Sequence, residues 1–117
     1  MNDFIPAAKP IVGEEERAAV DAVLASGMIA QGPQVAAFET EFAEQMVDGR
    51  ECVAVNAGTS GLHLGLLAAE IGPGDEVIVP SFTFAATANS VALTGATPVF
   101  ADIEPQYFCL DPAAVEA

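Results

Sequence analysis

Basic residues are almost absent from this chain of 117 residues. Three Lys and Arg side chains stand against 17 Asp and Glu, which gives a formal net charge of −14 at pH 7. A surface this acidic repels the phosphates of nucleic acids and of anionic membranes. The sequence therefore predicts that the protein binds neither. A small phosphorylated ligand stays compatible with this charge if backbone N–H groups hold the phosphate.

Cysteines and long apolar runs are scarce as well. The two cysteines, Cys52 and Cys109, are too few for a disulfide framework and lack the close spacing of a metal or redox pair, so we predict two buried side chains and no metal site. No apolar run reaches the about 18–20 residues of a membrane span. The N-terminus lacks the basic start of a signal peptide, and we expect a cytoplasmic protein.

Apolar residues, in contrast, make up 52% of the chain. A free-standing domain of this size buries only roughly two thirds of the surface that its unfolded chain exposes. We therefore expect some faces of this chain to be covered by something outside it.

Two amphipathic helices are predicted in the first part of the chain. Glutamates after Gly13 suit the positive end of a helix dipole, and Gly27 is placed to end that helix in the left-handed conformation. Pro33 opens the second helix, whose apolar residues recur at helical spacing. An extended segment comes before both. We predict an N-terminal part of this kind over 1–50 and a second part over 51–117.

The second part alternates strands with helices. Short apolar runs at 52–56, 76–79 and 97–101 are typical of buried parallel strands, and helices are predicted between them over 59–71 and 83–93. This pattern predicts an α/β fold with three parallel strands and right-handed crossover helices.

The turn after the first predicted strand offers donors for a phosphate. Gly58, Thr59 and Ser60 lie between that strand and a helix start, where free N–H groups, two hydroxyls and the helix dipole favour an anion. Thr59 or Ser60 could instead simply cap the helix. By spacing alone, capping is the more frequent outcome.

Further polar and aromatic residues follow the other two strands. Phe82 or Phe84 could lie flat against a planar ligand, although Phe side chains more often pack in the core. Asp102 suits either a hydrogen bond to a ligand or the capping of the next turn. His63 lies in an apolar helix with no acid or cysteine near it in sequence, so we predict a packed residue rather than a general base.

Six motifs, in this order, resemble the start of the DegT/DnrJ/EryC1/StrS aminotransferases. They are AKPIVGEEE, LASGMIAQGPQVAAFETEFA, VAVNAGTSGLHLGL, IGPGDEVIVPSFTFAATANSV, GATPVFADIEP and LDPAAVEA. Members of this family are pyridoxal-phosphate enzymes, many of which act on nucleotide-linked keto-sugars. The resemblance implies the N-terminal part of the large domain of an aspartate-aminotransferase-type (fold type I) enzyme, truncated here and homodimeric when complete.

The resemblance also implies roles for individual residues. Gly58, Thr59 and Ser60 match the family turn that holds the cofactor phosphate. Phe84 matches the aromatic residue that stacks on the pyridine ring, which leaves Phe82 for the core.

Other matched positions lie near the substrate or carry no chemistry. Gly27, Met28 and Ile29 match a segment close to the substrate and the dimer interface in relatives. His63 matches a family histidine without a catalytic role. Lys9, the one lysine of the sequence, matches a non-catalytic position.

Transamination through pyridoxal phosphate needs a lysine that bonds to the cofactor and an acid that keeps the pyridine nitrogen protonated. In the family both lie beyond the last motif found here. The resemblance therefore implies an N-terminal fragment, inactive alone, of an enzyme that transfers an amino group from an amino acid such as glutamate to a nucleotide-linked keto-sugar.

Three alternatives stay open at the level of sequence. One is a sugar dehydratase of the same family, in which a histidine replaces the lysine. Another is a non-catalytic α/β module that binds a phosphate or nucleotide. An unrelated doubly wound nucleotide-binding domain is the third, and it is disfavoured because the first strand-to-helix turn is not a G-x-G-x-x-G sequence.

Overall fold

The computed structural model describes residues 5–6 and 8–117. The chain divides into two compact units, Met1–Ala54 and Val55–Ala117. Within the described part, no helix combines the length and the apolar character that crossing a membrane requires.

The first unit contains the two predicted helices, α1 (Glu14–Ser26) and α2 (Pro33–Met46). Gly27 ends α1 in the left-handed conformation with φ 71°, and its N–H donates to the carbonyl of Leu24 at 3.2 Å. At the other end of α1, the carboxylate of Glu16 accepts a hydrogen bond from the Gly13 N–H at 2.6 Å. The backbone N–H groups of Glu16 and Gly13 hold the pKa of the Glu16 carboxyl below its ordinary value.

The predicted apolar face of α2 lies largely exposed within this unit. The rings of Phe38 and Phe42 contact each other, with centroids 5.8 Å apart and planes tilted by 53°. Both rings and the side chain of Met46 remain exposed to solvent. The apolar face of α2 is thus exposed, as a face that something outside this chain covers would be.

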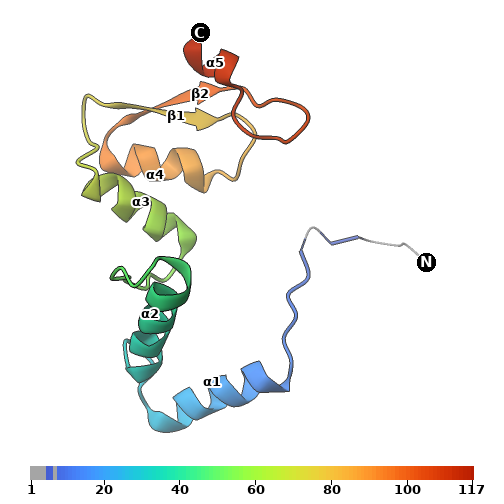
Figure 1. The fold of residues 1–117 in the computed structure, drawn as a ribbon, viewed down its shortest axis with the longest axis vertical. Helices are drawn as coiled ribbons and strands as arrows, with labels where there is room; N and C mark the ends of the chain where they lie inside the picture. The colour runs from blue at the N-terminus through green and yellow to red at the C-terminus, as the bar shows by residue number, and fades with distance from the viewer. Residues whose placement is uncertain (1–4, 7) are drawn as a thin grey trace. The chain divides into compact units, whose positions relative to one another are not determined.

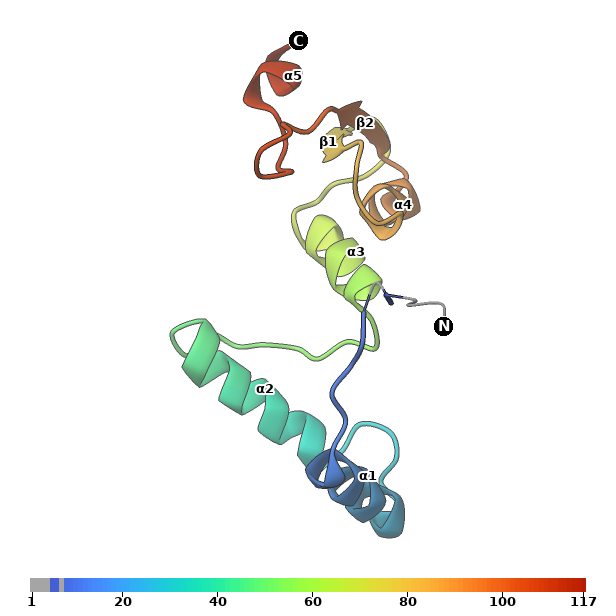
Figure 2. The ribbon, with the colours of Figure 1, turned by 90° about the vertical axis from the view of Figure 1, so that its right-hand side faces the viewer.

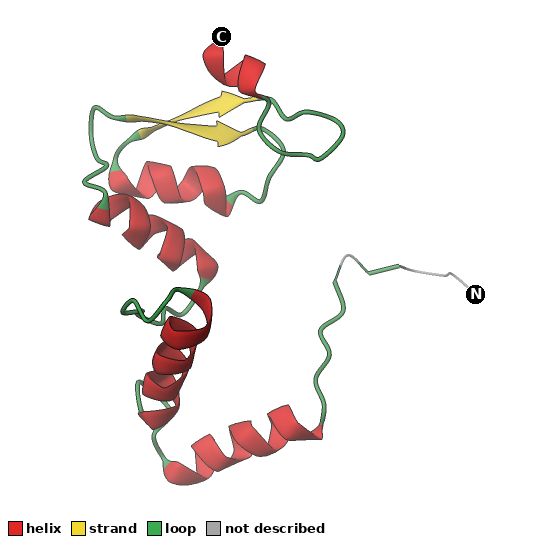
Figure 3. Ribbon diagram, in the orientation of Figure 1, coloured by secondary structure: helices red, strands yellow, loops and turns green. Residues whose placement is uncertain are grey.

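The prediction of a first strand over 52–56 is wrong. This segment lies in the loop between α2 and α3, drawn green in Figure 3. The N–H of Ala54 donates to Oε1 of Glu39 at 2.8 Å, so a side chain of α2 takes the place of a neighbouring strand. A strand needs a backbone partner, and no segment of the described chain pairs with 52–56. The sheet consequently has two strands instead of three.

The second unit is built around the parallel pair of β1 (Glu76–Pro80) and β2 (Thr97–Ala101). Helix α4 (Ala86–Thr94) connects the two strands, and α3 (Gly58–Ala68) packs against α4. Figures 1 and 2 show β1 and β2 side by side, pointing in the same direction, with α4 along one face. The predicted βαβ arrangement is therefore confirmed for this pair of strands.

The core of the second unit lies between β1 and α4. Val79 of β1 and Val91 of α4 are buried together with Ala96, and Leu66 of α3 packs against them. Ser90 is also buried, and its hydroxyl donates to a backbone carbonyl one turn earlier in α4. Burial of these apolar side chains fixes α4 on the sheet.

A short final helix, α5 (Pro112–Glu116), begins directly after Asp111. The Asp111 carboxylate accepts a hydrogen bond from the N–H of Ala113 at 2.9 Å. The expected burial of both cysteines is not confirmed, because Cys52 is half-buried and Cys109 is exposed. Both are free thiols.

Replacement of Gly95 tests the turn that joins α4 to β2. Gly95 has φ 87°, and a Cβ there would lie 3.0 Å from Cγ of Pro73. We expect Gly95→Ala to lower the free energy of unfolding by about 1–2 kcal/mol, the usual cost of a left-handed residue with a side chain. Chemical denaturation of the purified protein measures this change.

The matched control is Gly65→Ala in the middle of α3, where a new Cβ meets no atom within 4 Å. This change is expected to raise the free energy of unfolding by roughly 0.5–1 kcal/mol, because alanine favours helix more than glycine does. Equal effects of the two substitutions would contradict the account of the turn.

Candidate functional site

The N-terminus of α3 carries the three residues predicted to hold a phosphate. Ala57 is its N-cap residue, and no side chain caps the helix, so the alternative that Thr59 or Ser60 serves as a cap is wrong. No hydrogen bond to the N–H of Gly58 or Thr59 is found among residues 5–6 and 8–117. Two backbone donors at the positive end of the helix dipole are therefore free for an anion.

The Ser60 hydroxyl has a local partner. It donates to Oδ1 of Asn56 at 2.8 Å, across the turn that leads into α3. The N–H of Ser60 donates to the carbonyl of Ala57 at 3.0 Å, so Ser60 can donate to a ligand only if its hydroxyl turns away from Asn56. Sequence reasoning missed Asn56; its position four residues before Ser60, across a helix start, is the signal that could have identified it.

The two phenylalanines after β1 are both exposed. Phe84 is 81% exposed, as a residue that stacks on a ligand needs to be. Phe82 is 72% exposed, and the expectation that it lies in the core is not confirmed. Instead its ring contacts that of Phe108, with centroids 6.4 Å apart.

The ends of β1 and β2 meet through a pair of polar residues. The hydroxyl of Ser81 donates to Oδ1 of Asp102 at 2.9 Å, and the same oxygen accepts the N–H of Ile103 at 2.9 Å. The Ile103 N–H and then the Ser81 hydroxyl hold the pKa of the Asp102 carboxyl below its usual value of 3.8. Asp102 thus joins the loops that follow β1 and β2. The next turn is capped instead by Glu104, whose carboxylate accepts the N–H groups of Gln106 and Tyr107. Sequence reasoning missed Ser81, the partner of Asp102, although both residues directly follow strands that pair in parallel.

The first turns of α3 and α4 border one apolar groove. Gly61 of α3 and Thr87 of α4 both line this groove, which has a volume of about 360 Å³ and runs along β1. The structure gives no direct contact between Phe84 and residues 58–60. Residues 58–60 form the start of α3, and Phe84 lies two residues before α4, so the two helices that border the groove begin at or near predicted site residues. His63, predicted to be packed, is half-buried in α3.

The predicted substrate residues belong to the first unit. Gly27 is the left-handed residue after α1, while Met28 and Ile29 are exposed. The N–H of Met28 donates to the hydroxyl of Ser26 at 3.1 Å, which fixes the chain as it leaves α1. These three residues and the helix start of α3 lie in different units.

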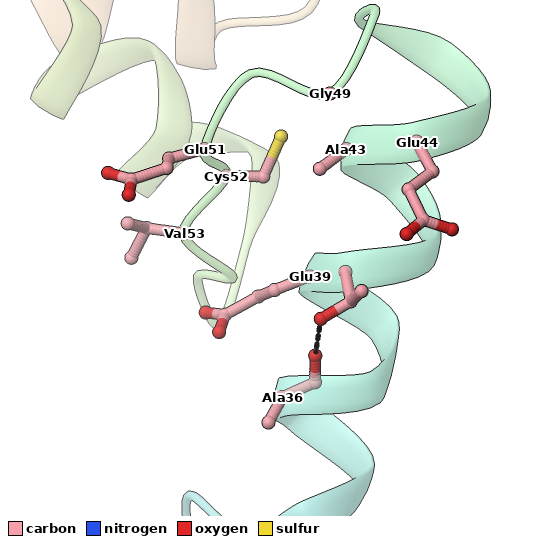
Figure 4. Close-up of a pocket in the computed structure, with 9 residues that line it drawn as sticks. Ala36, Glu39, Ala43, Glu44, Gly49, Glu51, Cys52 and Val53 are labelled. Atoms are coloured by element: carbon pink, nitrogen blue, oxygen red, sulfur yellow. Dashed lines mark hydrogen bonds between the residues drawn. The ribbon is translucent and has the colours of Figure 1, made fainter.

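A separate hollow of about 430 Å³ lies between α2 and the segment 49–53 (Figure 4). Its lining includes the carboxylates of Glu39, Glu44 and Glu51 together with Cys52. Three acidic groups make this hollow unsuitable for a phosphate. None of the predicted site residues lines it.

Comparison with known proteins gives a consistent result. Residues 10–117 match the model of the DegT/DnrJ/EryC1/StrS aminotransferase family. The spore coat polysaccharide biosynthesis protein SpsC of Bacillus subtilis (strain 168) is 48% identical over 116 residues, which are 99% of this chain and 30% of SpsC. The chain therefore spans about 30% of the length of this curated relative.

Solved structures agree with the sequence match. A DegT DnrJ EryC1 StrS aminotransferase from Brucella abortus superposes with a TM-score of 0.77 at 44% identity, over 86% of this chain and 27% of that one. The sugar aminotransferase Spr1654 from Streptococcus pneumoniae superposes with a TM-score of 0.83 at 37% identity, over 96% of this chain and 28% of that one. Its structures include PLP, PMP and apo forms. The fold-type-I class predicted from sequence is confirmed.

The ionised form of Asp102 is expected to stabilise the folded protein above about pH 4. Because folding lowers the pKa of this carboxyl from 3.8, its contribution is present above that value and is lost as the pH falls through the lower, folded value. Asp102→Asn keeps the hydrogen-bond acceptor but cannot ionise. We expect the variant to unfold more easily than the parent at pH 7, by chemical denaturation, and the difference to shrink as the pH falls below 3.8.

The control for loss of charge alone is Glu76→Gln, at the start of β1, whose side chain makes no hydrogen bond in the part of the chain that the structure describes. If Asp102→Asn and Glu76→Gln changed the free energy of unfolding equally at every pH, the role assigned to the Asp102 carboxylate would be contradicted.

Proposed function

Because this chain belongs to the DegT/DnrJ/EryC1/StrS aminotransferase family, we propose that it forms the phosphate-binding and ring-stacking part of a pyridoxal-phosphate site in a longer sugar aminotransferase. The family's cofactor is pyridoxal 5'-phosphate. The single observation that carries the proposal is the uncapped start of α3, with its free N–H groups on Gly58 and Thr59.

The donor set at α3 fits a phosphate. Lys9, Arg17 and Arg50 are the only Lys and Arg residues of the sequence, so the unit Val55–Ala117 has neither. A phosphate bound there relies on backbone N–H groups and on hydroxyls, which is the chemistry that a helix start supplies. Gly58 leaves open space beside its Cα, where a ligand can approach the backbone.

The residues of this chain bind and orient the cofactor and leave proton transfer to other groups. Pyridoxal phosphate, when bound, acts as an electron sink for the carbon that carries the amino group. Thr59 and Ser60 add their hydroxyls to the phosphate contacts, with Ser60 turning from Asn56 toward the ligand. Phe84 places its exposed ring against one face of the pyridine and excludes water from it.

The groups that move protons come from the remainder of the longer protein. Lys9 is the one lysine of this sequence and belongs to the other unit, far in sequence from α3. Lys9 also matches a non-catalytic position of the family, in which the catalytic lysine and the acid that pairs with the pyridine nitrogen lie beyond the motifs found here. We therefore propose that both are supplied outside these residues. Without them the chain alone is inactive.

We propose that the substrates and the oligomeric state of the complete enzyme are those of the family. The amino donor is an amino acid such as glutamate, and the acceptor is a nucleotide-linked keto-sugar. Gly27, Met28 and Ile29 contribute contacts near that sugar, and the complete enzyme is a cytoplasmic homodimer. Support comes from the exposed apolar face of α2 and from the exposed side chains of Met28 and Ile29, which an enzyme of this kind covers by assembly or by substrate.

An assay of the full-length protein tests the proposed activity. The protein is incubated with pyridoxal phosphate, glutamate and a nucleotide-linked keto-sugar, and 2-oxoglutarate and the amino-sugar are measured. Formation of both in equal amounts is expected. Loss of a sugar hydroxyl without consumption of glutamate would instead identify the dehydratase, and no turnover with any keto-sugar would contradict both.

Removal of the Thr59 hydroxyl tests the phosphate site. Thr59→Ala in the full-length protein is expected to weaken binding of pyridoxal phosphate about tenfold, as befits the loss of one hydrogen bond to a charged group. Binding of pyridoxal, which has no phosphate, should not change. Equilibrium dialysis of the protein against both compounds measures the two affinities.

Thr97→Ala is the matched control. Thr97 is an exposed threonine that begins β2, at the end of the strand opposite to Ala101. A phosphate site at α3 would be contradicted if Thr59→Ala and Thr97→Ala weakened binding of pyridoxal phosphate equally. It would also be contradicted if Thr59→Ala weakened binding of pyridoxal phosphate and of pyridoxal equally.

A further inference from the structure

Two loops begin at the same level of the sheet in the second unit. Pro80 and Ala101 are partners in the parallel register, and each ends its strand. The next residue on the first strand, Ser81, donates its N–H to the carbonyl of Ala101 at 2.9 Å and its hydroxyl to Asp102 at 2.9 Å. The loop after β1 is therefore attached to the loop after β2 at its first residue.

The Asp102 carboxylate is itself held in place. Its Oδ1 also accepts the N–H of Ile103, and its carbonyl accepts the N–H of Asp111 at 3.0 Å, from the far end of the same loop. An antiparallel bridge between Ile103 and Leu110 closes this loop. Ser81 thus bonds to a fixed acceptor rather than to a freely rotating side chain.

A ring pair makes the second attachment. Phe82 contacts Phe108, with centroids 6.4 Å apart and planes tilted by 46°. Phe108 has φ 58°, a left-handed conformation that residues with a side chain rarely adopt. Its N–H donates to the carbonyl of Glu104 at 3.1 Å, and the Glu104 carboxylate accepts the N–H of Gln106 at 2.7 Å. The loop after β2 is thereby shaped to present this one ring.

Phe84 lies just beyond these two attachments. Its carbonyl accepts the N–H of Thr87 at 3.0 Å, which ties it to the start of α4. Its ring has no aromatic partner within the described residues. The direction of the Phe84 ring therefore depends on how the backbone before it is held.

We propose that residues 102–111 form a positioning clamp for Phe84, acting through the Ser81–Asp102 hydrogen bond and the Phe82–Phe108 ring pair. This inference rests on the proposed function, in which Phe84 stacks on the cofactor ring. Phe82 and Phe108 stay 72% and 64% exposed, so their contact buries little apolar surface. The ring pair consequently contributes orientation more than folding stability.

The test uses the full-length protein with pyridoxal phosphate. Three readouts are compared: the dissociation constant of the cofactor by equilibrium dialysis, the visible circular dichroism of the bound cofactor, and thermal unfolding of the cofactor-free protein. Phe84→Leu is the reference variant. Ser81→Ala and Phe108→Leu each remove one attachment, while Ser81→Thr keeps the hydroxyl. Tyr107→Leu is the matched control, because Tyr107 is an exposed aromatic residue of the same loop that does not contact Phe82.

We expect Ser81→Ala and Phe108→Leu each to weaken cofactor binding about two- to tenfold, the range of one aromatic stacking contact, and to reduce the dichroic band. Ser81→Thr should restore the band. Tyr107→Leu should match the parent, and all these proteins should unfold within a few degrees of it.

The possible failures are distinguishable. If Phe84→Leu leaves binding and the band unchanged, the role proposed for Phe84 itself is wrong. If Phe84→Leu alters both and the two clamp variants alter neither, only the clamp is refuted. Should Phe108→Leu fail to fold, the pair of Ser81→Ala and Ser81→Thr decides the matter. An effect of Tyr107→Leu equal to that of Phe108→Leu would also overturn the clamp.

Discussion

The parallel register of β1 and β2 determines where the functional loops of the second unit begin. Because Pro80 lies opposite Ala101, the residues that follow both strands leave the sheet at one level. Packing of α4 against β1, through Val91 and Val79, fixes this register by burying apolar surface on one face. A shift of one residue would separate Ser81 from Asp102 and move Val79 out of the core.

Charge determines how the second unit can hold an anion. Val55–Ala117 has no Lys or Arg that could pair with an anion, and free backbone N–H groups stand at the start of α3. An exposed aromatic ring on the neighbouring loop adds an apolar surface. Together these features suit a planar, phosphorylated cofactor. The aminotransferase family to which the chain belongs uses such a cofactor, pyridoxal phosphate.

Local signals in the sequence predicted α1 to α4 and both strands of the sheet, with boundaries that differ by up to three residues from those observed. Gly27 and Pro33 mark helix boundaries through their own backbone preferences, so the sequence suffices there. The run at 52–56 has the composition of a buried strand, yet a strand exists only with a partner, and a single sequence does not say which segment pairs with which. Composition therefore predicted one strand more than the sheet contains.

The candidate site was predictable to a similar degree. Gly58, Thr59 and Phe84 emerged from motif order, and the structure leaves their donors and ring accessible. The exposure of Phe82 and its contact with Phe108 were not predictable, because residues 26 positions apart meet only through the fold. The hydrogen bond between Ser81 and Asp102 was not predictable for the same reason.

The most direct measurement of the central claim is a crystal structure of the full-length protein with pyridoxal phosphate. We expect the phosphate within hydrogen-bond distance of the N–H groups of Gly58 and Thr59, with the Phe84 ring against the pyridine. A phosphate bound away from the start of α3, or a pyridine ring that Phe84 does not touch, would contradict this claim.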